Sequence, residues 1–115
     1  MNDLKIWHNP RCSKSRQTLA LLVDRGLTPQ ITDYRDTPPS GAELRNLLAK
    51  LNCAAIDIIR HKDPLFRELN LSKTDSNETL IAAMTQNPML IERPIVFANG
   101  KAAIGRPPSA VLAIL

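Results

Sequence analysis

Residues 6–16, IWHNPRCSKSR, place one cysteine among basic and polar side chains. Arg11 comes directly before Cys12, Lys14 and Arg16 follow it, and the segment contains no acidic residue. A cysteine reacts as its thiolate, and the pKa of a thiol falls next to positive charge and to the free N–H groups of a helix start. Those same N–H groups bind oxyanions. The segment therefore predicts a reactive thiol beside an anion-binding loop.

Neighbouring side chains can tune such a thiol. We expect the hydroxyls of Ser13 and Ser15 to donate hydrogen bonds to the sulfur, and His8 to add positive charge near it. His8 alternates with Ile6, so the role of an ordinary sheet histidine is equally open. Cys12 could itself be a small buried hydrophobe, although its polar neighbours are poor core material.

Three arginines stand where they could complete an anion site. Arg60 ends the run IDIIR, Arg93 lies in IERPIV, and Arg106 lies in IGRPP. The planar guanidinium group suits a multi-oxygen anion better than an ammonium group does. The alternative for each arginine is a solvated or ion-paired surface side chain.

Other candidate residues carry less chemistry. Cys53 lies in the apolar stretch LNCAAIDII, which favours packing, and His61 and Trp7 are interpreted as surface and packing residues. The sequence has no glycine-rich phosphate loop and no pair of closely spaced cysteines or histidines. We therefore predict no metal site and no bound cofactor.

The elements that must position these residues follow from periodicity. Alternation predicts a strand at about 3–8, followed by a helix that Ser13 or Ser15 caps and that runs to about Arg25 before Gly26. Further along, a capping box of Ser40 and Glu43 opens a helix, and Asn99-Gly100 predicts a hairpin turn. The remaining expectations are a strand in 29–35, helical pieces at 56–60, after Asp63-Pro64 and at about 78–86, the hairpin strands within 94–105, and a final helix over 107–115.

This order predicts an α/β fold. A helix joins the first two strands, so they should be parallel, and the hairpin should add antiparallel partners. The resulting mixed sheet flanked by helices matches the thioredoxin-like layout, as one domain over residues 1–115 with a helical insertion at about 40–88 between the second and third strands.

Composition narrows the functional classes. The 115 residues carry a net charge of +4 but only 3% aromatic side chains, which argues against nucleic acid as a partner. The apolar runs are too short for a membrane span, and the first residues lack the pattern of a secretory signal. We expect a cytosolic protein with no membrane partner.

Taken together, HNPRCSKSRQTL at 8–19, IIR ending at Arg60, ERPIV at 92–96 and NGKAAIGRPP at 99–108 make the chain resemble the glutaredoxin-linked arsenate reductase family. The resemblance covers essentially the whole chain. Better-known members resemble HNPxCGTSR around the cysteine, and the Ser13 and Lys14 found here match a shorter branch.

The resemblance implies a role for each matching residue. Cys12 would be the nucleophile, Arg60, Arg93 and Arg106 would bind the anion, and a cis peptide bond would precede Pro94. It also implies the reaction: the thiolate attacks arsenate, glutathione joins the adduct as co-substrate, glutaredoxin reduces the mixed species, and arsenite leaves in a process of arsenic detoxification.

Two other functions stay open at this point. One is a regulator without enzymatic activity that binds a protein such as RNA polymerase, as the Spx-like relatives of this fold do. Those relatives usually carry a second cysteine three positions after the first, where this chain has Ser15. The other is a glutathione-dependent reductase that acts on disulfides or on another oxidised substrate.

Overall fold

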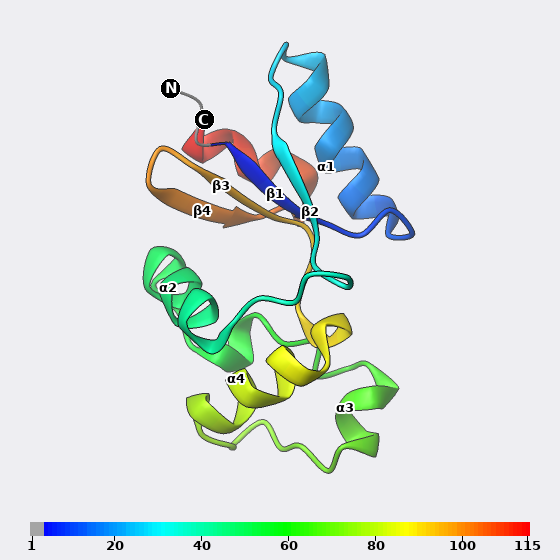
Figure 1. Cartoon of the computed structure of the whole chain (residues 1–115), viewed down its shortest axis with the longest axis vertical. Helices are drawn as coiled ribbons and strands as arrows, with labels where there is room; N and C mark the ends of the chain where they lie inside the picture. The colour runs from blue at the N-terminus through cyan, green and yellow to red at the C-terminus, as the bar shows by residue number, and fades with distance from the viewer. Residues whose placement is uncertain (1–3) are drawn as a thin grey trace. The chain divides into compact units, whose positions relative to one another are not determined.

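The computed structural model describes residues 4–115, which divide into two compact units (Figure 1). The first unit combines the chain up to Thr37 with Arg93–Leu115, and the second is Pro38–Glu92. The second unit contains the expected insertion at about 40–88.

The first unit is built on a four-stranded sheet. Its strands are β1 (Lys5–His8), β2 (Gln30–Asp33), β3 (Ile95–Ala98) and β4 (Lys101–Ile104), in the spatial order β2-β1-β3-β4. β1 and β2 are parallel, whereas β1 with β3 and β3 with β4 are antiparallel. The predicted mixed sheet is therefore confirmed; residue 3 of the expected first strand lies outside the described residues.

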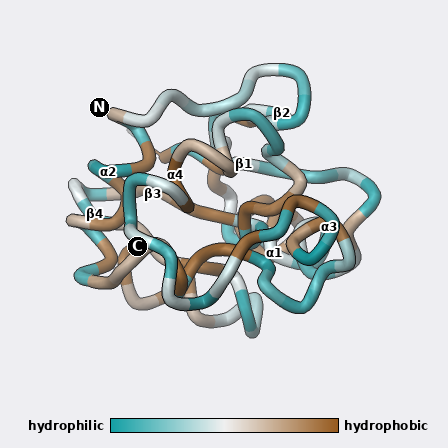
Figure 2. Tube along the Cα trace, turned by 90° about the horizontal axis from the view of Figure 1, so that it is seen from below, coloured by the Kyte–Doolittle hydropathy of each residue, from teal (hydrophilic) through white to brown (hydrophobic). Residues whose placement is uncertain are grey.

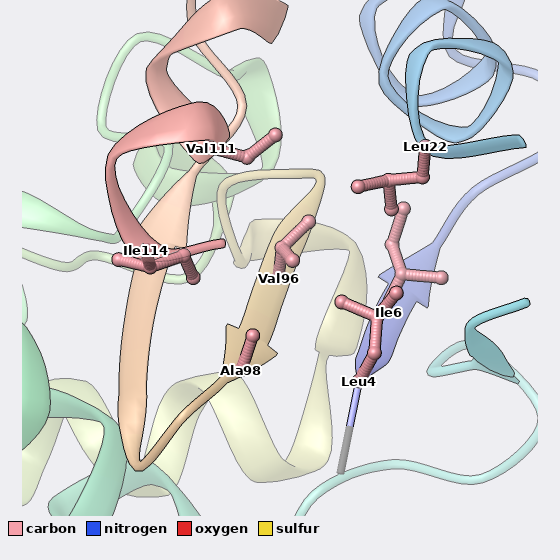
Figure 3. Packing of buried hydrophobic residues seen from close by; sticks show 7 residues of the cluster. All are labelled: Leu4, Ile6, Leu22, Val96, Ala98, Val111 and Ile114. Atoms are coloured by element: carbon pink, nitrogen blue, oxygen red, sulfur yellow. The ribbon is translucent and has the colours of Figure 1, made fainter. Parts of the chain in front are cut away.

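One face of this sheet forms a hydrophobic core (Figure 3). Ile6 of β1 and Val96 of β3 are register partners, so their side chains share this face. Leu22 of the helix α1 (Ser13–Asp24) and Val111 of the 3-10 segment η3 (Pro108–Ile114) pack against them. The cluster is completed by Leu4, Ala98 and Ile114.

The start of α1 differs from the sequence prediction. Cys12 itself is the N-cap residue, Ser13 is the first helical residue and Ser15 lies within the first turn. Neither serine caps the helix, because the extended backbone that a cap requires occurs one residue earlier, at φ −95° and ψ 123° for Cys12. The predicted end is confirmed, since Gly26 follows the helix with a φ of 78°.

Two cis peptide bonds flank the hairpin in the second half of this unit. The Arg93–Pro94 bond is cis, and so is Arg106–Pro107, which the sequence reasoning did not include. Between them, Asn99 and Gly100 have φ angles of 54° and 73° and form the predicted hairpin turn. The expected final helix is the 3-10 segment η3 instead of an α-helix.

The second unit is helical, with α2 (Gly41–Leu51), α3 (Pro64–Glu68) and α4 (Asn77–Gln86) joined by the 3-10 turns η1 (Ala55–Asp57) and η2 (Pro88–Leu90). The predicted capping box is present: the Ser40 hydroxyl accepts from the Glu43 N–H, and the Glu43 carboxylate accepts from the Ser40 N–H. The Asp63 carboxylate caps α3 at the Leu65 N–H, 2.9 Å away.

The prediction of a helix at 56–60 is wrong. Only η1 is helical there, and Ile59 forms an isolated antiparallel bridge with Ile91. The Arg60 N–H donates to the Leu90 carbonyl at 2.7 Å, and the Glu92 N–H donates to the Ile58 carbonyl at 2.8 Å. Consecutive buried isoleucines are compatible with either backbone, and pairing with a distant segment determines the outcome.

Hydrophobic stretches along the chain are short and interrupted by hydrophilic residues (Figure 2). Within residues 4–115, no helix has the length and apolar content needed to cross a membrane.

Candidate active site

Cys12 occupies the junction between β1 and α1 in the first unit. Its N–H donates to the Asn9 carbonyl at 3.0 Å, and its carbonyl accepts from the Arg16 N–H at 3.0 Å, which closes the first turn of α1. The thiol is half-buried. The sulfur therefore stands in front of the unpaired N–H groups of a helix start.

Opposing influences act on the pKa of the Cys12 thiol. Burial, the largest single effect, raises this pKa. The backbone N–H groups of Ser15 and Lys14, hydrogen bonding from Arg93 and the positive charge of Arg106 all lower it. Their sum exceeds the effect of burial, so the pKa of Cys12 lies below its ordinary value and the thiolate is favoured.

The arginine at the exit of β4 reaches this sulfur. Arg106 Nη2 lies 3.6 Å from Cys12 Sγ, and Arg106 Nε donates to the Arg93 carbonyl at 2.8 Å. Arg106 is exposed and Arg93 is half-buried. The structure thus brings three of the residues named from the sequence together at one edge of the sheet: Cys12, Arg93 and Arg106. Pro94 follows Arg93 through the cis bond and is buried.

Ser15 and His8 form a buried network beneath the loop. The Ser15 hydroxyl accepts from the Asn9 N–H at 2.9 Å and forms a 2.7 Å hydrogen bond with His8 Nδ1. The hydroxyl that the sequence reasoning directed at the sulfur therefore binds His8 and the Asn9 N–H in the structure. It is the Ser15 backbone N–H that acts on the Cys12 thiol.

The surroundings of His8 disfavour the positively charged imidazole, which supports the role of a sheet histidine among the two roles left open from the sequence. Burial lowers its pKa, and the charges of Arg16 and Arg35 act in the same direction, while Asp33 opposes them. The net result is a pKa of His8 below its ordinary value, which favours the neutral imidazole. A neutral ring suits a packed position under the loop better than an imidazolium would.

Two features of the site escaped the sequence reasoning. Asn9 is buried, and its side-chain Oδ1 accepts from the Arg11 N–H at 3.0 Å, which shapes the loop before the thiol. At the end of β2, Arg35 binds both carboxylate oxygens of Asp33, at 2.9 and 2.7 Å. The Asn9-Pro10 step in the sequence could have indicated the structural role of Asn9. Nothing in the sequence linked Asp33 to the active-site end of the sheet.

Arg60 belongs to the second unit. Its Nη1 lies 3.4 Å from Glu92 Oε1 and its Nε lies 3.9 Å from Asp63 Oδ2, so two carboxylates of the same unit partly neutralise it. Cys53 also lies in this unit, where burial, followed by the charge of Asp57, raises the pKa of its thiol. The surroundings therefore lower the thiol pKa at Cys12 and raise it at Cys53.

The arrangement in the first unit is chemically suited to a nucleophilic thiolate that attacks an anion. A helix start and two guanidinium groups offer hydrogen-bond donors and positive charge around one sulfur. Such a set activates the thiolate and stabilises negative charge on an oxyanion that it attacks.

The chain resembles known proteins over its whole length. The ArsC family model matches residues 7–114. The uncharacterized protein YfgD of Escherichia coli K12 is 54% identical, over 98% of this chain and 97% of its own length. A protein of Neisseria meningitidis described as an arsenate reductase is 48% identical over the full length of both chains. The structure of an arsenate reductase from Vibrio cholerae matches with a TM-score of 0.94, at 49% identity and 97% coverage of each chain.

Proposed function

The chain belongs to the ArsC family, and from this we propose that it is a cytosolic arsenate reductase with Cys12 as its nucleophile. The observation that carries the proposal is the contact of Arg106 Nη2 with the Cys12 sulfur, 3.6 Å long, at the start of α1. A thiol whose pKa is lowered beside a guanidinium group can both bind and attack an anionic tetrahedral oxyanion.

The reaction begins with attack of the Cys12 thiolate on arsenic(V). A sulfur–arsenic bond forms, and one arsenate oxygen leaves as water after protonation. Arg93 and Arg106 donate to the remaining oxygens, and Arg60 is proposed as the third arginine of this anion site. Reduction of arsenic(V) to arsenic(III) takes two electrons, which two thiols provide as they form a disulfide.

Those thiols come from outside the chain in this proposal. Ser15 occupies the position where a resolving cysteine would stand, so Cys12 has no partner within its loop. Glutathione joins the arsenic adduct as co-substrate and displaces a second oxygen as water. A glutaredoxin thiolate then attacks the glutathione sulfur, so that a glutathione–glutaredoxin disulfide forms and the electron pair of the broken sulfur–arsenic bond stays on arsenic(III). Water hydrolyses the remaining Cys12–arsenic(III) bond, which releases arsenite and the free Cys12 thiol. His8 and Ser15 hold the loop that carries the nucleophile, through the hydrogen bonds to the Ser15 hydroxyl.

A coupled assay tests the proposal. Oxidation of NADPH is followed in the presence of arsenate, glutathione, glutaredoxin and glutathione reductase, with wild type, Cys12→Ser and Cys53→Ser. We expect arsenate-dependent turnover in the wild type and in Cys53→Ser, and its loss in Cys12→Ser. Omission of glutathione or of glutaredoxin should each abolish turnover.

Other results would lead to other functions. Turnover with a small disulfide that exceeds the protein-free control and is lost in Cys12→Ser, without turnover on arsenate, would identify a thiol reductase with a different substrate. Turnover no greater than the protein-free control with either substrate would contradict the enzymatic proposal and favour the regulator.

A further inference from the structure

Gly105 is the residue between β4 and Arg106, and it has no room for a side chain. A Cβ atom at this position would lie 2.5 Å from Thr18 Oγ1 and 2.7 Å from Pro94 Cγ. Both distances are shorter than 3.0 Å, a separation below which Cβ atoms essentially never approach other heavy atoms in proteins. Backbone conformation is not the reason, because the glycines with a positive φ in the described chain are Gly26 and Gly100. The requirement at Gly105 is one of space.

The neighbours of Gly105 are held in place. Thr18 is fully buried, and its Oγ1 donates to the Lys14 carbonyl at 2.8 Å, within the first turns of α1. The Gly105 N–H donates to the Pro94 carbonyl at 2.9 Å, and Pro94 is buried. A new methyl group at residue 105 would therefore displace its own backbone more readily than it would displace these neighbours.

Displacement of residue 105 acts directly on Arg106. The guanidinium group of Arg106 is held between the Arg93 carbonyl, 2.8 Å from Nε, and the Cys12 sulfur, 3.6 Å from Nη2. Cys12 begins the same helix whose Thr18 touches Gly105. The close contact of Gly105 with Thr18 and Pro94 therefore fixes how near the backbone of Arg106 comes to the start of α1.

We propose that Gly105 is a positioning residue, whose bare Cα lets the exit of β4 pack on Thr18 and Pro94 so that Arg106 reaches the Cys12 sulfur. The proposal rests on the proposed function, in which that sulfur is the nucleophile. Arg106 acts on the thiolate, and Gly105 acts only through Arg106.

The test measures the pKa of the Cys12 thiol from the pH dependence of its alkylation by iodoacetamide, in a Cys53→Ser background. Gly105→Ala and Arg106→Ala should each raise that pKa, and the double variant should raise it no further than Arg106→Ala alone. An opposite charge within reach shifts a pKa by about 1–3 units, and exposure of Arg106 favours the lower end, so alkylation near pH 7 should slow by about tenfold or less. This assay contains no arsenate, so failure of the proposed reaction and failure of this inference are distinguishable.

Gly41→Ala is the matched control. The atoms nearest to a Cβ at Gly41, the first residue of α2, belong to the end of the flexible Arg45 side chain, at 3.3 Å and beyond. The thiol pKa should be unchanged in this variant. The fold of every variant is checked by far-ultraviolet circular dichroism and thermal unfolding.

Two results would overturn the proposal. One is a folded Gly105→Ala protein with an unchanged thiol pKa, and the other is a rise that persists in full when Arg106 is already absent. Should Gly105→Ala not fold, Thr18→Val probes the same contact from the helix, because a methyl group larger than Oγ1 then faces Gly105. We expect Thr18→Val to raise the pKa of the Cys12 thiol, and not to raise it further when Arg106→Ala is also present. An unchanged pKa in Thr18→Val, or a full rise on top of Arg106→Ala, would contradict the proposal.

Discussion

Opposing effects act on the pKa of the Cys12 thiol. Burial alone would keep the thiol protonated, as it does at Cys53, where burial raises the pKa. At Cys12 the N–H groups of Ser15 and Lys14, together with Arg93 and Arg106, outweigh burial. The two cysteines have similar exposure and differ in the charge and the donors around them.

A pH profile of alkylation separates the two thiols. The lowered pKa of Cys12 means that its thiolate persists as pH falls below the ordinary thiol range, whereas the raised pKa of Cys53 delays its ionisation to higher pH. We expect iodoacetamide to modify Cys12 first at about pH 6–7, and Cys53 to follow only at higher pH. Peptide mass spectrometry after timed quenching measures both sites, and equal labelling at pH 6–7 would contradict the assignment.

At the scale of single residues, the sequence predicted which groups gather but not which atoms bond. Basic and polar neighbours were enough to single out Cys12, and Arg106 does contact it. The Ser15 hydroxyl could reach several partners, and burial next to His8 and the Asn9 N–H decided between them. The lowered pKa of His8 also depends on its burial, which the alternation of β1 does not determine.

At the scale of elements, the sequence predictions succeeded where residues close together in the chain determine the structure. The capping box at Ser40 and the Asn99-Gly100 turn are determined by side chains or φ angles within four residues. It failed at 56–60, where pairing of Ile59 with Ile91, far along the chain, overrides local preference. It also failed at the start of α1, where the N-cap is Cys12 and not a serine.

The capping box of α2 gives a prediction for stability. Ser40→Ala removes the acceptor for the Glu43 N–H and should lower the free energy of unfolding by about 1 kcal/mol, within the usual 0.5–2 kcal/mol for such caps. Urea denaturation followed by circular dichroism measures the change. The control is Ser109→Ala, at an exposed serine in η3, which should have no effect beyond about 0.5 kcal/mol. Equal stability of wild type and Ser40→Ala would contradict the role of the cap.

At the scale of the whole molecule, the order of elements was sufficient to predict the sheet. A helix between the first two strands and a tight turn between the last two fix which pairs are parallel and which are antiparallel. The anion site was predictable only in part, because Arg93 and Arg106 flank one hairpin whereas Arg60 belongs to the second compact unit. Local sequence patterns identify Arg60 as a candidate but carry no information about contacts with distant residues. Its role in anion binding therefore stays a prediction.

The central claim is that the Cys12 thiolate reduces arsenate, and the direct test is to measure arsenite itself. Purified protein is incubated with arsenate, glutathione and glutaredoxin, and arsenite is separated from arsenate by chromatography and quantified by elemental mass spectrometry. We expect many arsenite molecules per wild-type protein, and only the level of a protein-free control with Cys12→Ser. Equal arsenite formation by wild type and Cys12→Ser, or none by the wild type, would contradict the account.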